Sequence, residues 1–180
     1  MMYLQKVLPF KHIEEFGLQI VEMPYMGDEL SMFILLPEDD LSSCSFLLSL
    51  TLEKINEWTD RKNMDSGGYI DLYLPKFKLE DSYDLKKALA HLGMTDVFDE
   101  KLADLTAINR EGGLFVSAAV HKSFIDVNEE GTEAAAATGI SIQLCCLIIG
   151  KKFMADHPFL FLIRHNTSKT ILFFGRFSSP

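Results

Sequence analysis

The stretch HKSFIDVNEEGTEAAAATGISIQLCCLIIGKKFMADHPF, residues 121–159, carries most of the information about the fold. Its first residues belong to a run from Phe115 to Val127 in which apolar side chains occupy both sides of an extended chain. That pattern is typical of a strand buried on both faces. We therefore expect a buried strand to enter the segment that follows.

The alanine-rich part of this stretch fits two different local structures. Thr132 as N-cap, four alanines and Gly139 as terminator predict a short helix, which composition alone favours. The same residues also alternate as a strand, and small side chains would let that strand enter a packed sheet with little displacement. A segment that fits two states is suited to a conformational switch.

Two hairpins are indicated on either side of this stretch. Residues 16–25 and 30–36 are apolar runs around a Gly27-Asp28 turn, and they predict two largely buried strands. Residues 159–164 and 171–177 predict a second hairpin, joined by a polar turn at 166–169. Residues 69–74 alternate with period two and end at Pro75, which predicts a further strand.

Two helices are also predicted. Thr51 can cap a helix in which Leu52, Ile55 and Trp58 share one face, with Trp58 in the core. Residues 85–92 have apolar side chains at helical spacing, and Gly93 can take the left-handed cap position. Short helices, several strands and no alternation of strand and helix indicate an α+β fold with mainly antiparallel sheet.

Composition excludes several classes of protein. The chain has 180 residues, 48% of them hydrophobic, which suits one globular domain. Its net charge of −9 argues against nucleic acid and anionic membrane as partners. The five histidines lack metal-ligand spacing and no phosphate-loop or dinucleotide motif occurs, so we expect no metal and no cofactor.

The cysteines and the apolar runs indicate the compartment. Cys44, Cys145 and Cys146 are an odd set with two adjacent members, which does not form a disulfide framework and suits a reducing compartment. The first residues lack a secretory apolar stretch, and no run approaches the about 18 residues of a membrane span. We expect a cytoplasmic protein, with extracellular release by an unconventional route as a second location.

Several motifs together resemble one family. The segment EEGTEAAAATG (129–139) resembles the hinge of the serpin reactive loop, and HKSFIDVNEE (121–130) resembles the strand that leads into it. The segments ADHPFLFLIRHN (155–166) and ILFFGRFSSP (171–180) are similar to the family's C-terminal strand pair, and upstream segments occur in the family's order. The chain is identified as a member of the ovalbumin-like intracellular clade of serpins, covering the C-terminal half.

This resemblance implies a serpin fold, with residues 1–180 forming a partial serpin domain and the exposed reactive loop at about 129–153. Serpins are not enzymes but suicide inhibitors of serine proteases, so no catalytic residue is expected. The loop is cleaved to an acyl-enzyme and then inserts as a new strand of the main sheet. The implied hinge comprises Glu129, Glu130, Gly131, Thr132, Glu133, Ala134, Ala135, Ala136 and Ala137.

The spacing usual in the clade places the reactive bond between Cys145 and Cys146, with Leu144 as the rival specificity residue. These side chains are uncharged, so chymotrypsin-like or elastase-like serine proteases are the expected partners. A plainer interpretation of the cysteine pair is two exposed thiols with no role in recognition.

Two further positions follow from the resemblance. His121 falls where the family has a buried histidine in the shutter that controls sheet opening, so we expect a structural role for it. Lys76 and Glu129 match positions that form an ion pair in several relatives, and such a pair would restrain insertion of the loop.

Because the resemblance covers only the C-terminal half of a serpin, one wall of the insertion slot is absent from this sequence. We therefore expect the chain alone not to form covalent complexes with proteases. Two other functions then stand beside inhibition: an interaction module that self-associates through an open sheet edge, and a simple protease substrate.

Overall fold

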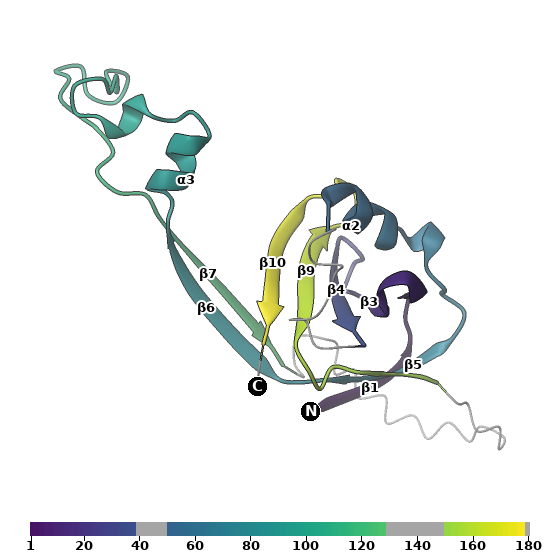
Figure 1. Ribbon diagram of the computed structural model, residues 1–180. Helices are drawn as coiled ribbons and strands as arrows, with labels where there is room; N and C mark the ends of the chain where they lie inside the picture. The colour runs from purple at the N-terminus through teal and green to yellow at the C-terminus, as the bar shows by residue number, and fades with distance from the viewer. Residues whose placement is uncertain (39–49, 129–149, 179–180) are drawn as a thin grey trace. The chain divides into compact units, whose positions relative to one another are not determined.

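The computed structural model describes residues 1–38, 50–128 and 150–178 (Figure 1). The chain divides into two units, one formed by Met1–Phe77 with Asn128–Pro180 and the other by Lys78–Val127. We call them unit 1 and unit 2. No helix among the described residues is both long and apolar enough to cross a membrane.

Unit 1 contains a five-stranded antiparallel sheet in the order β10-β9-β4-β3-β2. Its strands are β2 (Phe10–Ile13), β3 (Leu18–Pro24), β4 (Leu30–Pro37), β9 (Phe159–His165) and β10 (Ile171–Phe177). Both predicted hairpins are confirmed, since β3 pairs with β4 and β9 with β10. The structure adds that β4 pairs with β9, which joins the two hairpins into one sheet.

One face of this sheet carries the main hydrophobic core. The helix α2 (Leu52–Trp58) covers it, and Thr51 caps this helix by accepting a hydrogen bond from the Lys54 amide at 3.3 Å. Trp58 is buried, as predicted. The cluster comprises Leu18, Ile20, Phe33, Leu35, Ile55, Trp58, Met64, Leu160 and Leu162.

An aromatic cluster also packs against β9. The ring of Phe77 lies 5.9, 5.7 and 4.8 Å from those of Phe159, Phe161 and Phe177, centroid to centroid. Opposite Phe161, β10 has Gly175, and a Cβ atom there would lie 2.5 Å from the Cζ atom of Phe161. Glycine is therefore required for the ring of Phe161 to lie against the β10 backbone.

Unit 1 also contains a three-stranded sheet in the order β1-β5-β8. The strands are β1 (Met2–Val7), β5 (Tyr69–Leu74) and β8 (Lys151–Met154). β5 was predicted, and its alternate residues Ile70, Leu72 and Leu74 are buried. β1 pairs with it antiparallel and β8 parallel, so this sheet is mixed.

Unit 2 contains the helix α3 (Lys86–His91) and two strands, β6 (Phe77–Asp84) and β7 (Val120–Val127), which form a two-stranded sheet. Gly93 ends α3 with φ of 97°, as predicted. The amides of Gly93 and Met94 donate to the carbonyls of Ala90 and Leu89, which is a Schellman motif. The described residues also form three short 3-10 helices, Glu14–Phe16, Arg61–Asn63 and Asp96–Phe98.

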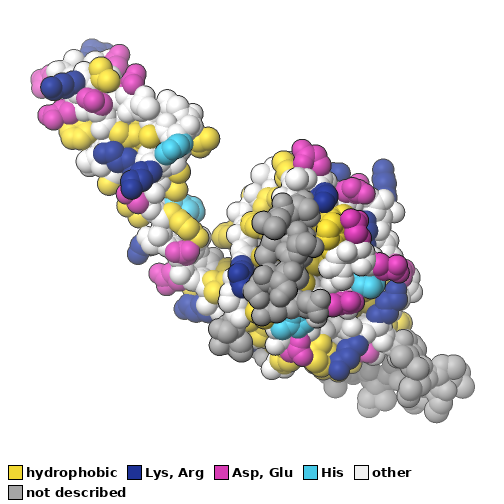
Figure 2. Space-filling model, viewed as in Figure 1, with side chains coloured by type: hydrophobic (Ala, Val, Ile, Leu, Met, Phe, Trp, Pro, Cys, Tyr) yellow, Lys and Arg dark blue, Asp and Glu magenta, His cyan; other side chains and the backbone are white. Residues whose placement is uncertain are grey.

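The prediction of a strand from Phe115 to Val127 buried on both faces is wrong. The strand begins at Val120, and the side chains of Val120 and Phe124 are 66% and 51% exposed. Among the described residues β7 pairs only with β6, and a two-stranded ribbon has no second layer to cover its faces. Figure 2 shows hydrophobic side chains of unit 2 at the surface among charges of both signs.

A buried carboxylate on β3 links the five-stranded sheet to the 3-10 helix Arg61–Asn63. Glu22 on β3 is fully buried and accepts hydrogen bonds from the Ser31 hydroxyl at 2.6 Å and from Arg61 Nη2 at 2.7 Å. The Arg61 guanidinium also binds Asp28, and this hydrogen bonding lowers the pKa of the Asp28 carboxyl. Asn166 Nδ2 donates to Ser31 Oγ at 2.9 Å, so the network also reaches the β9–β10 turn.

Replacing Arg61 should leave the Glu22 charge buried without its cationic partner. The Arg61 side chain is 40% exposed, so solvent screening makes the expected loss from Arg61→Leu about 2 kcal/mol in urea unfolding, less than for a fully buried pair. Adding Glu22→Gln removes the orphaned charge and should restore part of the stability. Equal effects of Arg61→Leu with and without Glu22→Gln would show that the pair is not coupled.

The contact at Gly175 predicts an overpacking penalty. Gly175→Ala should destabilise the chain by about 1–3 kcal/mol, because the ring of Phe161 must move. Gly67→Ala is the matched control, since a Cβ at Gly67 meets only Asp65 Oδ1 at 3.6 Å. Similar urea unfolding midpoints for Gly175→Ala and Gly67→Ala would contradict the overpacking penalty at position 175.

Candidate functional site

The predicted reactive loop joins β7 to β8, and the structure describes both of these strands. Segment 129–149 lies outside the described residues. That segment includes all nine hinge residues, Glu129 to Ala137, and also Leu144, Cys145 and Cys146. Their assigned roles therefore stay predictions, and the geometry available for the site is that of its two flanks.

The downstream flank, β8, is firmly anchored in unit 1. Phe153 in its centre is fully buried. β8 pairs in parallel with β5 from Ile70↔Lys151 to Tyr73↔Met154, and the amide of Ala155 donates to the Tyr73 carbonyl at 2.9 Å. A chain leaving residue 149 therefore enters a fixed strand at once.

The first residue of β8 is also held through its side chain. Lys151 Nζ lies 2.7 Å from Asp65 Oδ2 and 5.1 Å from the centroid of the Phe10 ring. The hydrogen bond from Lys151 lowers the pKa of the Asp65 carboxyl. Both members of this ion pair are more than half exposed, so it contributes to position more than to stability.

Gly150, just before β8, lies tightly against β5. A Cβ atom there would lie 2.8 Å from Asp71 Oδ2 and 3.1 Å from the Tyr69 carbonyl oxygen. A side chain at this position would displace the Asp71 carboxylate. Glycine therefore lets the chain come close to β5 just before β8, which begins at Lys151, within the predicted loop of about 129–153.

Asp71 organises polar side chains across the three-stranded sheet. Its Oδ1 atom accepts hydrogen bonds from the Tyr3 hydroxyl at 3.0 Å and from Gln5 Nε2 at 2.8 Å. The hydrogen bond to Asp71 raises the pKa of the Tyr3 phenol. The rings of Tyr3 and Tyr73 lie 5.0 Å apart, and Lys152 Nζ lies 5.7 Å from the centroid of Tyr73.

The upstream flank, β7, is open within unit 2. Phe124 lies under the ammonium group of Lys78, at 4.9 Å from Nζ to the ring centroid. His121 on β7 is exposed, and β7 has only β6 beside it among the described residues, so its expected structural role stays a prediction. Lys76 is exposed, but its predicted partner Glu129 lies outside the described residues, so the ion pair stays a prediction.

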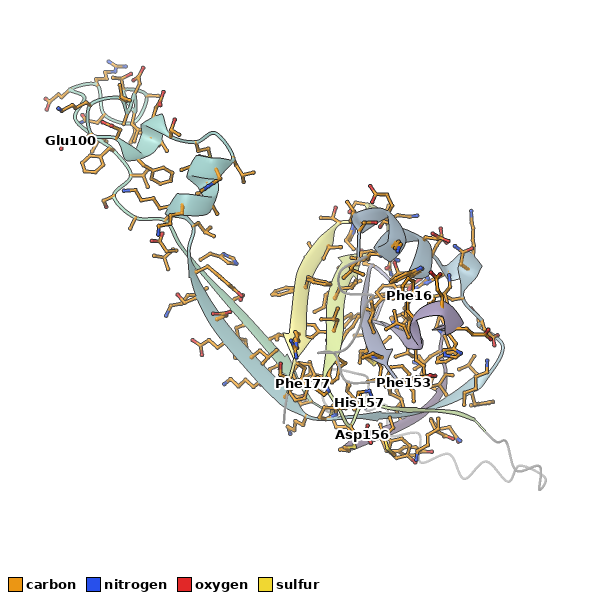
Figure 3. The ribbon with its side chains drawn as sticks, viewed as in Figure 1. Phe16, Glu100, Phe153, Asp156, His157 and Phe177 are labelled. Atoms are coloured by element: carbon orange, nitrogen blue, oxygen red, sulfur yellow. The ribbon has the colours of Figure 1, made fainter. Side chains whose placement is uncertain are left out.

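The adjacent pair Asp156 and His157 is the arrangement most similar to an acid–base site, and it has a structural role instead. Figure 3 shows both residues close to Phe153, in the connection that leads into β9. His157 Nδ1 lies 2.8 Å from Asp156 Oδ1, and Nε2 contacts the Pro37 carbonyl oxygen. Both ring nitrogens thus face protein oxygens and tie this connection to the end of β4.

A small pocket of about 250 Å³ lies beside this histidine. Its lining residues are Gln19, Leu36, Pro37, Glu38, Lys152, Met154 and His157. It falls below the about 300 Å³ at which small-molecule sites begin. Within residues 1–38, 50–128 and 150–178, no group of three or more His, Cys, Asp or Glu side chains could hold a metal ion.

Sequence reasoning missed the anchoring residues Gly150, Asp65 and Asp71. One signal was present, because Tyr69, Asp71 and Tyr73 alternate with the buried residues of their strand and so must share its outer face. That Tyr3 and Gln5 join them depends on the register of β1 against β5, with Tyr3 opposite Tyr73 and Gln5 opposite Asp71.

Comparison with solved structures supports the fold. A crystal structure of uncleaved ovalbumin matches with a TM-score of 0.79 and 33% identity, covering 99% of this chain and 44% of that one. A crystal structure of maspin matches with a TM-score of 0.76 and 33% identity, over 99% and 47% of the two chains.

Comparison with curated proteins points the same way. The leukocyte elastase inhibitor of Xenopus laevis is 52% identical and that of Equus caballus 50%, each over all of this chain and 48% of the relative. Human Serpin B9 is 48% identical over the same shares. This chain therefore spans about half the length of the curated relatives that it matches.

The family model that matches residues 1–180 is described as "Serpin (serine protease inhibitor)". This description names an inhibitor of serine proteases, and the names of two of the relatives above name an inhibitor of leukocyte elastase. Together with the α+β fold and the sequence identity of about 50% over the whole chain, this match shows the family. The chain belongs to the serpins, in the ovalbumin-type intracellular clade.

Proposed function

We propose that this chain carries the reactive loop of a serine protease inhibitor, at about residues 129–153. The observation that carries the proposal is the match of the entire chain to the serpin family model. The inhibitors of leukocyte elastase among its relatives indicate the class of target. The anchored β8 supports it too, because a fixed strand beyond the bait holds one end of the loop in place.

The proposed chemistry is that of an interrupted serine protease reaction. The protease serine Oγ attacks the carbonyl carbon of Cys145, the peptide bond to Cys146 breaks, and the amine of Cys146 leaves with the proton that the protease histidine delivers. An ester between Cys145 and the serine remains. Inhibition requires that the loop move before water hydrolyses this ester.

An uncharged residue at position 145, or at the rival position 144, fits an apolar specificity pocket. Chymotrypsin-like and elastase-like proteases are the proposed targets. Trypsin-like proteases are disfavoured because the aspartate of their pocket finds no cation. The lysines that follow, Lys151 and Lys152, are already paired with Asp65 and the Tyr73 ring in β8.

The proposed movement is insertion of the loop as a strand next to β7. The small hinge residues, Glu129 to Ala137, would require little new space in the sheet. An inserted strand needs a hydrogen-bonding partner on both edges. β7 can supply one edge, because among the described residues it pairs only with β6.

The exposed ribbon of β6 and β7 favours a second function for the chain by itself. Val120 and Phe124 are largely exposed on β7, so apolar surface and unpaired backbone are open to another chain. On this proposal the chain is a protease substrate and an interaction module that self-associates through this edge. The cytoplasm is the proposed location, as for the clade.

The first test mixes the 180-residue chain separately with leukocyte elastase, chymotrypsin, pancreatic elastase and trypsin. We expect cleavage between Cys145 and Cys146, located by mass spectrometry, with no SDS-stable complex. The reason is that β7 offers one edge and that, among the described residues, no strand faces it across the slot. An SDS-stable high-mass band with any of the apolar-specific enzymes would show that the chain traps proteases unaided.

The second test exchanges the specificity residue. Cys145→Arg should make trypsin cleave after position 145, because the aspartate of its pocket gains a cation. It should lower cleavage there by elastase at least about tenfold, because the charge finds no partner in an apolar pocket. Leu144→Arg is the matched control for the rival register. If Leu144→Arg lowers elastase cleavage and Cys145→Arg does not, the reactive bond lies one residue earlier, between Leu144 and Cys145.

A further inference from the structure

The short connection between β8 and β9 is tied to both sheets of unit 1. The amide of Ala155 donates to the Tyr73 carbonyl at 2.9 Å, which holds the start of the connection on the three-stranded sheet. Two residues later, His157 Nε2 contacts the carbonyl oxygen of Pro37, the last residue of β4 in the five-stranded sheet. The imidazole of His157, labelled in Figure 3, therefore joins the two sheets.

Both ring nitrogens of His157 face atoms that only accept hydrogen bonds. Nδ1 lies 2.8 Å from Asp156 Oδ1, and Nε2 faces the Pro37 carbonyl oxygen. The hydrogen bond from His157 lowers the pKa of the Asp156 carboxyl, so this carboxyl stays ionised and has no proton to donate. A neutral imidazole has one N–H donor, whereas the imidazolium cation has two. Only the cation can therefore make both hydrogen bonds at once.

The charged groups around His157 come from several elements. Lys152 on β8 and Glu38, just after β4, line the same pocket as His157. The Glu38 carboxylate is in turn 3.0 Å from Nε2 of His12 on β2. Two carboxylates, those of Asp156 and Glu38, thus stand against the single ammonium group of Lys152 at this pocket. The chain's net charge of −9 has the same sign, so the local and the overall fields both favour a cationic imidazole.

We propose that His157 is a pH-dependent clamp between the two sheets of unit 1, closed in mildly acidic solution and weakened at alkaline pH. When the imidazolium loses a proton, one of its nitrogens keeps only a lone pair and faces an oxygen lone pair. The ring then gives up either the Asp156 contact or the Pro37 contact. In both cases the β8–β9 connection is held less firmly to β4. This inference does not rest on the proposed function.

The two partners set the pH range of the clamp. In the unfolded chain neither acceptor is fixed, so the pKa of His157 there is the ordinary value of about 6.5. The clamp binds the second proton more tightly, so its stabilisation is fully present below about pH 6.5 and is lost as the pH rises further. The lowered pKa of Asp156 sets the acidic limit. The contribution of this carboxylate is present above the ordinary value of 3.8 and is lost as the pH falls through its lower value in the folded chain.

The titration of His157 is the first measurement. Deuterium exchange at the ring carbon Cε1, followed by mass spectrometry of peptides from the 180-residue chain, gives a titration midpoint for each histidine. We expect the midpoint of His157 to lie above the about 6.5 of an unperturbed histidine. A midpoint at or below that value would overturn the proposal, because the folded chain would then not favour the cation.

A substitution tests whether this proton stabilises the fold. The readout is the ratio of the folding equilibrium constants at pH 6 and pH 8.5, obtained from urea unfolding. His157→Gln should lower this ratio about three- to tenfold, as expected for one hydrogen bond to a charged group whose side chain is 31% exposed. His91→Gln is the matched control, since His91 is an exposed histidine on α3 in unit 2, and it should leave the ratio unchanged.

Asp156→Asn distinguishes a proton-dependent clamp from simple packing. An amide at position 156 can donate to an unprotonated Nδ1 while Nε2–H still donates to Pro37, so the neutral ring keeps both contacts. We expect this variant to retain its stability at pH 8.5, and the titration midpoint of His157 to fall toward about 6.5.

Three results would overturn the proposal. One is a pH ratio that is the same in His157→Gln as in the unsubstituted chain, and another is a ratio that falls as much in His91→Gln. The third is a His157 midpoint that Asp156→Asn leaves unchanged. If His157→Gln does not fold, the midpoints of His157 in the unsubstituted chain and in Asp156→Asn decide by themselves.

Discussion

The structure depends on the pairing of β9 between β4 and β10. Residues 159–164 are buried, so this strand contributes to both faces of the five-stranded sheet. Leu160 and Leu162 complete the cluster under α2, while Phe159 and Phe161 complete the aromatic cluster with Phe77. Arg164 continues the first face, where its guanidinium lies over Phe33 and binds Thr59. Because β8 precedes β9 by a short connection, the position of the loop's downstream end also follows from this pairing. The predicted loop thus leads, through β8, into a strand whose residues 159–164 are all buried.

Local pattern predicted the elements whose neighbours are close in sequence. The hairpins at residues 18–37 and 159–177 were predicted because each has two apolar runs around a polar turn. Thr51 and Gly93 were assigned correctly because capping needs only a few adjacent residues. The pairing of β1 with β5, and the parallel pairing of β5 with β8, could not be predicted, since periodicity does not specify which distant strand fills an edge. The error on β7 has a related cause: its apolar residues predicted burial, but burial depends on layers that β6 alone does not supply.

In the candidate site, too, some features could be predicted from the sequence and others depend on strands that are distant along the chain. The family resemblance predicted the hinge and the reactive bond, and the uncharged residues at 144 and 145 predicted the apolar specificity; these stay predictions, since residues 129–149 lie outside the described residues. Neither indicated that a Cβ atom at Gly150 would displace the Asp71 carboxylate, because Asp71 lies on another strand. Neither placed Tyr3 beside Asp71, although the alternation of Tyr69, Asp71 and Tyr73 showed that one face of β5 is polar. The structural role that the resemblance implies for His121 stays a prediction, because the described residues place only β6 beside β7 and leave His121 exposed.

The proposed mechanism asks two different things of the predicted loop. The hinge segment must enter a packed sheet with little displacement, and the four alanines at 134–137 suit that requirement. Recognition by a protease instead favours side chains that fill a specificity pocket, where one methylene is worth about 1–3 kcal/mol. The sequence separates the two requirements, because the alanines precede Gly139 and the predicted specificity residues, Leu144 and Cys145, follow it.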